Sequence, residues 1–240
     1  PYLKPYQKVI HRRLSKIIGA ENRLTGGKMT LADFASGHEY FGLHHRNNQW
    51  VFREWAPNAE NIFLIGDMTD WQEEEAFSLK RLDNGVWEIR LSSDTFKHQD
   101  LYRLRMHWSG GKGDRIPAFA RRIVQDSTTL IFNAQVWLPN TSYQWQFPDF
   151  RRPTEAPLIY EAHIGMATEE HRVGSYSEFR KDVLPHVIRG GYNTLQLMAV
   201  QEHPYYGSFG YHVSSFFAAS SRSSIPSLRV LVATDLSTFS

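Results

Sequence analysis

The sequence predicts a multidomain chain: a short N-terminal helical segment, an antiparallel β-sandwich, and then the start of a parallel α/β domain. Three observations support this order. Apolar residues first recur at helical spacing, then alternate with polar residues, and finally form two continuous apolar runs on either side of a helix. Because each architecture requires its own period, these changes indicate separate structural units along the chain.

The helical segment covers residues 1–36. The spacing of its apolar residues predicts an amphipathic helix that packs against the next domain, and Gly19 is the expected end of this helix. The hydroxyl of Thr30 is placed to cap a second short helix that contains Ala32 to Ala35. The apolar positions of the first helix have basic residues between them: Tyr6, Val9, Ile10, Leu14, Ile17 and Ile18.

The sandwich covers residues 37–139. In the stretch 102–108, apolar and polar side chains alternate, which is the pattern of a half-buried strand. The stretch 86–91 likewise puts Trp87, Ile89 and Leu91 on one face. Because no helical pattern intervenes, the strands should pair as an antiparallel sandwich. Further strands are expected at 50–55, 61–66 and 128–138, with turns at 56–58, 83–85 and 109–113.

A proline-rich linker, 140–157, leads to the last segment, 158–240. There the apolar runs 158–165 and 194–200 flank a helix that starts at the cap Ser175 and extends to Ile188. Continuous apolar strands joined by a helix are typical of a βαβ unit in a parallel sheet, where both faces of each strand are buried. The segment is too short for a finished sheet or barrel.

Composition excludes several classes of function. With 27 Lys+Arg against 25 Asp+Glu, the chain lacks the positive excess of a nucleic-acid-binding protein. It has no cysteine, so disulfides, thiolate zinc sites and thiol nucleophiles are excluded. No apolar run approaches the roughly 20 residues that span a bilayer. We expect a cytoplasmic protein without membrane contact, metal or cofactor.

Aromatic residues are abundant: 15 Phe, 11 Tyr and 7 Trp. They concentrate in the run 202–212, which follows the second apolar strand and combines a carboxylate, two histidines and three tyrosines. Flat rings beside polar groups suit a sugar site, but a well-packed loop without ligand fits the composition equally well. Glu161 and Glu202 are not expected to be a glycosidase pair, because Glu161 lies in the middle of a strand.

Several motifs resemble those of one family. The stretches 54–57 and 63–71 are similar to the start of a carbohydrate-binding module of family 48, and 115–119 to its later part. The stretch 160–165 is similar to a first barrel strand, and 196–203 with 208–222 to the following strand and loop. Together they resemble the branching-enzyme subgroup of glycoside hydrolase family 13, the α-amylase family. After Arg222 the chain departs from the family pattern.

This resemblance implies an immunoglobulin-like module followed by an incomplete (β/α)8 TIM barrel. It implies an enzyme that cleaves an α-1,4 bond of glycogen, amylose or starch and forms an α-1,6 branch. The reacting carboxylates are expected beyond residue 240, so this chain alone should be inactive. The substrate-binding residues carried over are Tyr211, Glu202, His203, Tyr205 and Trp71.

Other readings stay open at this point. Trp71 would bind sugar or simply be a buried packing residue. The chain would instead be a non-catalytic α-glucan-binding protein, or part of another α-amylase-family hydrolase such as a debranching enzyme.

Overall fold

The computed structural model describes residues 2–141, 144–145, 148–150, 154–198 and 200–223. Two units are distinguished, residues 1–40 and the chain from Phe41 onward. The helices are α1 (Gln7–Thr25), α2 (Leu31–Phe34), α3 (Gly37–Tyr40), α4 (Tyr176–Glu178) and α5 (Leu184–Arg189). Short 3₁₀ turns lie at Lys4–Tyr6, Asp67–Thr69, Glu75–Phe77, Asp83–Gly85, Ile164–Met166, Tyr206–Ser208 and Ser221–Ser223.

In the first unit, the prediction that α1 ends at Gly19 is wrong. The helix continues for six more residues to Thr25 and ends where Gly26 adopts a left-handed conformation with φ 62°. One glycine inside a helix costs only about 1 kcal/mol, which the helix-forming residues after it offset. The cap at Thr30 is confirmed: its hydroxyl accepts a hydrogen bond from the Asp33 amide, and the Asp33 carboxylate accepts one from the Thr30 amide.

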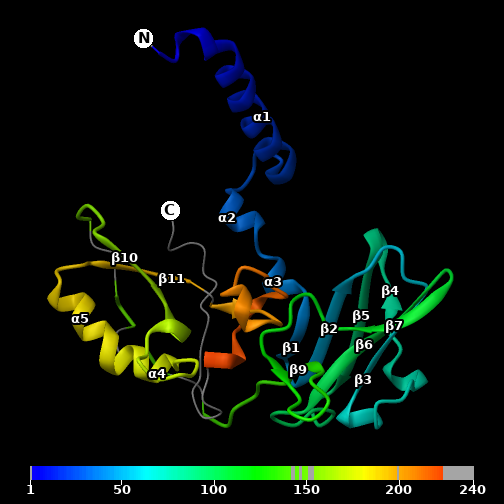
Figure 1. The fold of residues 1–240 in the computed structure, drawn as a ribbon. Coiled ribbons are helices and arrows are strands. Elements are labelled where there is room, and N and C mark those ends of the chain that lie inside the picture. Colours follow the sequence, from blue (N-terminus) through cyan, green and yellow to red (C-terminus); the bar gives the residue numbers. More distant parts are fainter. Residues whose placement is uncertain (1, 142–143, 146–147, 151–153, 199, 224–240) are drawn as a thin grey trace. The chain divides into compact units, whose positions relative to one another are not determined.

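The sandwich consists of two antiparallel sheets (Figure 1). One has the order β1-β2-β5-β4, and the other has the order β3-β6-β9-β8, with β7 also paired to β6. Their strands are β1 (Gly42–Arg46), β2 (Gln49–Trp55), β3 (Asn61–Gly66), β4 (Lys80–Arg81), β5 (Val86–Ser92), β6 (Leu101–Trp108), β7 (Gly111–Arg115), β8 (Ile123–Gln125) and β9 (Phe132–Gln135).

The predicted strands at 50–55, 61–66, 86–91 and 102–108 are confirmed as β2, β3, β5 and β6. Two expectations need correction. The strand expected at 128–138 shrinks to β9, because Asp126 accepts hydrogen bonds from the amides of Thr128 and Thr129 and closes a turn there. The turn expected over 109–113 occupies only its first two residues, since β7 pairs with β6 from Gly111 onward.

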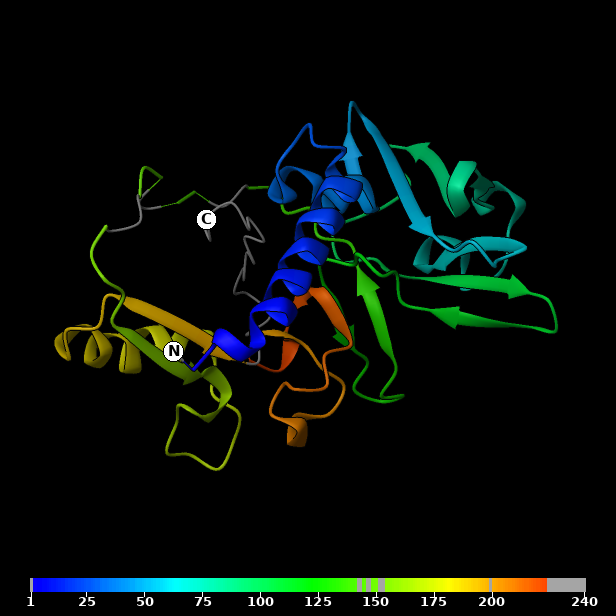
Figure 2. The same cartoon turned by 90° about the horizontal axis from the view of Figure 1, so that it is seen from above.

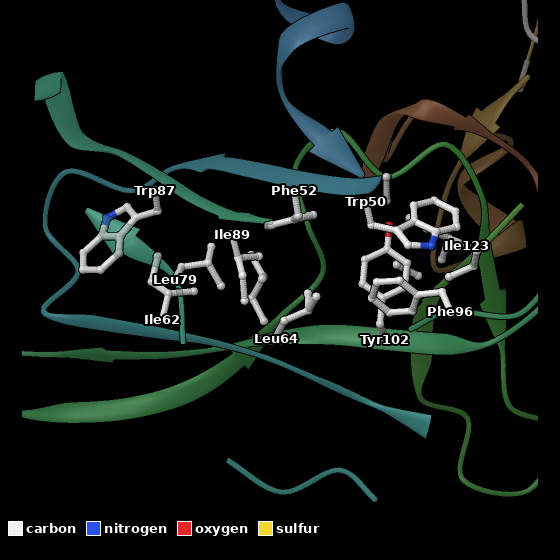
Figure 3. Packing of buried hydrophobic residues seen from close by; sticks show 14 of the residues in the cluster. Trp50, Phe52, Ile62, Leu64, Leu79, Trp87, Ile89, Phe96, Tyr102 and Ile123 are labelled. Atoms are coloured by element: carbon white, nitrogen blue, oxygen red, sulfur yellow. The ribbon is translucent and has the colours of Figure 1, made fainter. Parts of the chain in front are cut away.

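The core lies between the two sheets. Figure 3 shows Trp50 and Phe52 of β2 opposite Leu64 of β3 and Tyr102 of β6. The rings of Phe52 and Tyr102 meet edge to face with centroids 6.4 Å apart. Ala218, far away in sequence, is also buried in this cluster. The sandwich core therefore includes a residue that follows the parallel strands.

A stack of three phenylalanine rings makes a second connection of this kind. The Phe41 and Phe119 centroids are 5.2 Å apart, and those of Phe119 and Phe217 are 4.5 Å apart. Phe41 precedes β1, Phe119 lies between β7 and β8, and Phe217 lies in β13 (Ser215–Ala219). Segments far apart in sequence thus pack together at the sandwich.

After residues 136–158, whose described part contains no helix or strand, β10 (Ile159–His163) pairs in parallel with β11 (Thr194–Met198). The two strands lie side by side in Figures 1 and 2. The helix between them begins at the predicted cap Ser175, includes a π-helical turn at Phe179–Val183 and buries Phe179 and Val187. The βαβ unit is thus confirmed.

The burial expected for both strands is not found. Ile159 is 49% exposed, and Leu197 is also exposed. A strand of a parallel sheet is buried by neighbours on two edges and two faces, whereas here each strand has one partner in the described chain. β11 is followed by the short strand β12 (Gln201–Glu202), which pairs with β13 across the aromatic loop.

Candidate functional site

The loop 202–214 connects β12 to β13 and begins just beyond the carboxyl end of the parallel strand β11. In α/β folds, ligands bind at this edge of the strands. The loop contains four of the five residues predicted to bind substrate: Glu202, His203, Tyr205 and Tyr211. The structure brings these four together, and Trp71 lies on a separate loop of the sandwich.

Glu202 is completely buried, with 0% exposure. Its Oε1 accepts a hydrogen bond of 3.0 Å from the His203 amide, and its Oε2 accepts one of 2.8 Å from the Ser221 amide. Its backbone carbonyl accepts another from the Ser214 amide. A buried carboxylate needs such donors, and here the carboxylate links the start of the loop to Ser221, beyond β13. Glu202 therefore has no surface with which to touch a ligand, and it anchors the start of the loop.

His203 is also buried, and its Nδ1 lies 3.1 Å from the Gln201 carbonyl oxygen, to which it donates. Its carbonyl accepts a hydrogen bond from Arg222 Nε at 3.3 Å. The ring packs near Tyr206, with centroids 6.4 Å apart. Like Glu202, His203 is buried and stabilises the backbone of the loop through hydrogen bonds.

Tyr205 and Tyr211 are the exposed members of the loop, at 66% and 73%. They are separated by a 3₁₀ turn and by Phe209 in a left-handed conformation with φ 51°. Large exposed aromatic side chains on a backbone held by buried residues offer flat faces for contact.

Sequence reasoning missed the polar residues behind this loop. His163, the last residue of β10, lies against Tyr206 and Phe209, with ring centroids 6.3 and 6.2 Å apart. Both ring nitrogens of His163, the Tyr176 hydroxyl and Nε2 of His203 are buried and have no hydrogen-bond partner among the described residues. Buried polar groups normally have partners. The sequence feature that could have identified His163 is its position at the end of a parallel strand.

Electrostatics at this cluster disfavour a tyrosinate. Burial, and then the charge of Glu202, raise the pKa of Tyr176. Burial also raises the pKa of Tyr206. Both hydroxyls thus remain protonated near neutral pH as hydrogen-bond donors. The Tyr206 hydroxyl donates to the Met166 sulfur at 3.5 Å, and the Tyr176 hydroxyl has no partner among the described residues.

Trp71 is half-buried, on the loop that follows β3. Asp70 and Trp71 both have positive φ, 46° and 61°, and the Trp71 amide donates to the Gly66 carbonyl at 3.0 Å. A Cβ on Gly66 would lie 2.1 Å from the Leu101 carbonyl oxygen, so only glycine fits. A positive φ costs a tryptophan conformational free energy, and it persists only where surrounding contacts hold the backbone in place.

Glu73 fixes the same loop onto the outer face of the five-stranded sheet. Its Oε1 lies 3.1 Å from His107 Nε2, 3.3 Å from Lys112 Nζ and 3.9 Å from Arg105 Nε. Despite the opposing effect of burial, the hydrogen bonds and charges of Lys112 and His107 lower the pKa of Glu73. The loop therefore presents Trp71 on a fixed backbone.

Within the ranges that the structure describes, no three His, Cys, Asp or Glu side chains gather as a metal site would require. The helices in those ranges include none with the length and apolar character needed to cross a membrane.

Comparisons with known proteins agree with this geometry. Residues 40–120 match carbohydrate-binding module 48 (isoamylase N-terminal domain). The chain is 40% identical over 236 residues to a 1,4-alpha-glucan-branching enzyme of Rhizophagus irregularis, covering 94% of this chain and 34% of the relative. It is 39% identical over 230 residues to one of Solanum tuberosum, covering 92% and 27%. The chain thus spans about one third of the length of these relatives.

Solved structures share the fold at low sequence identity. Apo pullulanase from Paenibacillus barengoltzii superimposes with a TM-score of 0.62 at 18% identity, over 85% of this chain and 36% of that one. The catalytic module of the pneumococcal virulence factor SpuA gives 0.56 at 16%, over 77% and 32%. These solved structures show a shared fold. The sequence relatives show that more than nine tenths of this chain is similar to 1,4-alpha-glucan-branching enzymes, and residues 40–120 match carbohydrate-binding module 48.

Proposed function

We propose that this chain is the glucan-binding part, and the beginning of the catalytic domain, of a 1,4-α-glucan branching enzyme. The observation that carries this proposal is the identity of 35–40% with branching enzymes over nearly the whole chain. The solved pullulanases, in contrast, are similar at only 16–19%. The same contrast argues against a debranching hydrolase.

The domain division that we propose is a helical segment at 1–36, a sandwich at 37–139, a linker at 140–157 and the first β/α units of a barrel from 158 on. The parallel pairing of β10 and β11 supports a barrel start. So does the exposure of their apolar residues, since further strands on both edges would bury them.

In the proposed site, Tyr211 and Tyr205 stack against glucose rings, and Glu202 and His203 position their loop. His163 and Tyr176 lie behind the same loop, and their buried polar atoms have no partner among the described residues. Trp71 would supply a separate contact on the sandwich, which binds α-glucans such as glycogen, amylose and starch.

Branching breaks an α-1,4 bond, forms a glycosyl-enzyme and passes the glycosyl group to a 6-hydroxyl. Such retaining chemistry uses two carboxyl groups about 5–5.5 Å apart. Glu202 is engaged by backbone amides, so it does not fill either role. We therefore expect the 240-residue chain alone to leave amylose unchanged, as judged by iodine staining and reducing ends. Measurable branching by the purified chain would contradict this assignment.

Glucan binding is tested by co-sedimentation with glycogen. Tyr211→Ala and Trp71→Ala should each reduce the bound fraction severalfold, because each removes a proposed stacking face. Trp55→Ala is the matched control: Trp55 is an exposed tryptophan on the other sheet, and its loss should leave binding unchanged. Full retention by both site variants, or a loss confined to the control, would place the glucan elsewhere. The cytoplasm is the compartment that we propose, although the Arabidopsis thaliana relative is named as chloroplastic/amyloplastic.

A further inference from the structure

The outer face of the four-stranded sheet contains a cavity of about 170 Å³ that plays no part in the sites above. It lies on the sheet opposite to the one that carries the Trp71 loop. The lining residues come from three neighbouring strands and one hairpin turn: His44, Arg46, Asn47, Gln49, Val51, Arg53 and Arg90.

The strand register explains why these residues converge. On β1 and β2, His44 is opposite Val51 and Arg46 is opposite Gln49. On β2 and β5, Val51 is opposite Arg90. Alternate residues of a strand share a face, and Phe52 and Ile89 of the same strands occupy the core. The cavity residues therefore face away from the core.

Positive charge dominates this cavity. Three of its seven lining residues are arginines, and none is an acid. On the same face of the sheet, the Glu88 carboxylate accepts from Arg53 Nε at 2.6 Å and from Arg90 Nε at 2.8 Å. One carboxylate thus orients two of the guanidinium groups.

His44 lines the same cavity. Its Nε2 donates to the Phe41 carbonyl at 2.8 Å. Burial, and then the charges of Arg121, Arg46 and Arg53, lower the pKa of His44. The arginines therefore contribute a positive potential at this ring.

We propose that this cavity binds a phosphate monoester carried on a sugar. Guanidinium groups match phosphate oxygens in a planar, bidentate geometry. The side-chain amides of Asn47 and Gln49 offer both donors and acceptors for sugar hydroxyls. A volume of about 170 Å³ is below the roughly 300–1,000 Å³ of pockets for drug-sized ligands, so it suits one phosphorylated ring.

Two sources provide this chemistry: a phosphate ester on an α-glucan chain, and a free sugar phosphate. Isothermal titration calorimetry on the full chain would use glucose 6-phosphate, a phosphorylated maltodextrin and the same maltodextrin without phosphate. Tighter binding of the phosphorylated dextrin than of the plain one identifies the glucan source. Binding of glucose 6-phosphate alone identifies the free metabolite.

Arg90→Gln removes one guanidinium from the cavity and leaves the Arg53–Glu88 pair in place. Its expected effect is a loss of about tenfold in affinity for the phosphorylated ligand, the size of one charge-assisted hydrogen bond. Arg115→Gln is the matched control, because it removes the same charge from β7 on the other sheet. It should leave the affinity within about twofold, since Arg115 does not line the cavity and salt screens exposed charges.

If Arg90→Gln lowers the melting temperature, Arg46→Gln tests the affinity for the phosphorylated ligand from the opposite side of the cavity. The proposal is overturned if the unmodified chain gives no saturable heat with either phosphorylated ligand. It is also overturned if Arg115→Gln weakens binding as much as the two cavity variants, because the attraction would then come from net charge alone.

Discussion

Replacing Glu202 with alanine tests whether one buried carboxylate holds the aromatic loop together. The carboxylate accepts hydrogen bonds from the His203 and Ser221 amides, at 3.0 and 2.8 Å, and is fully buried. Alanine would leave both amides without a partner. Each buried, unpaired donor costs about 1–3 kcal/mol, so the loop should lose about 2–6 kcal/mol.

The loss should be local, because the Glu202 carboxylate links the start of the loop to Ser221 just after β13. Hydrogen exchange of the full chain, followed by mass spectrometry or NMR, measures it directly. At the lower limit of about 2 kcal/mol, protection of the His203 and Ser221 amides should fall about 30-fold. Amides in β3 and β6 should keep their protection.

Glu161→Ala is the matched control, since Glu161 is an exposed glutamate in β10. Its replacement should leave exchange in the loop unchanged. Unaltered protection of His203 and Ser221 in the Glu202 variant would refute the reasoning. Equal losses in both variants would show that the effect arises from β10 and β11 and not from the carboxylate.

Three further predictions concern stability. Burial raises the pKa of Glu54, so its ionised form destabilises the fold. As the pH rises from about 4 through the raised pKa of Glu54 in the folded state, the wild-type chain should lose unfolding free energy relative to Glu54→Gln, as measured in urea titrations. A difference in unfolding free energy that does not change with pH would contradict this. Gly66→Ala should cost about 1–3 kcal/mol of stability in thermal melts, because a Cβ clashes with the Leu101 carbonyl. Gly19→Ala is the control: it lies in α1 with open space around it and should increase helix content. Equal effects of the two variants on stability would refute both expectations. In limited proteolysis the first cuts should fall after about residue 139, and a segment from 158 as resistant as the sandwich would show that β10 and β11 are stable in this chain.

The sandwich was largely predictable because its long strands alternate apolar and polar residues. β6 is the clearest case, with Tyr102 and Leu104 in the core and Arg103 and Arg105 outside it. β1 was missed because two adjacent histidines, His44 and His45, interrupt its apolar–polar alternation. The signal that would have revealed it is the Asn47–Asn48 pair, whose positive φ values of 51° and 59° make a two-residue hairpin turn.

For the candidate site, the sequence shows which residues share a loop, but not which of them are buried. The sequence shows that Glu202, His203, Tyr205 and Tyr211 share a loop, but polarity does not reveal that the two polar residues are buried. Their burial depends on backbone donors, among them the Ser221 amide, which only the folded chain brings within reach. Similarly, nothing in the sequence pairs Glu73 with the cations that fix the Trp71 loop.

The three-ring stack of Phe41, Phe119 and Phe217 has a topological consequence. The chain leaves the sandwich after β9, forms the parallel pair, and returns to the sandwich at β13, where Phe217 and Ala218 pack. The βαβ unit is thus tethered at both ends, as an insertion is. A double tether keeps the local concentration of the aromatic loop near the sandwich high, even after a single break in the linker. A glucan bound to the module would therefore remain within reach of Tyr211 without any further contact between the two parts.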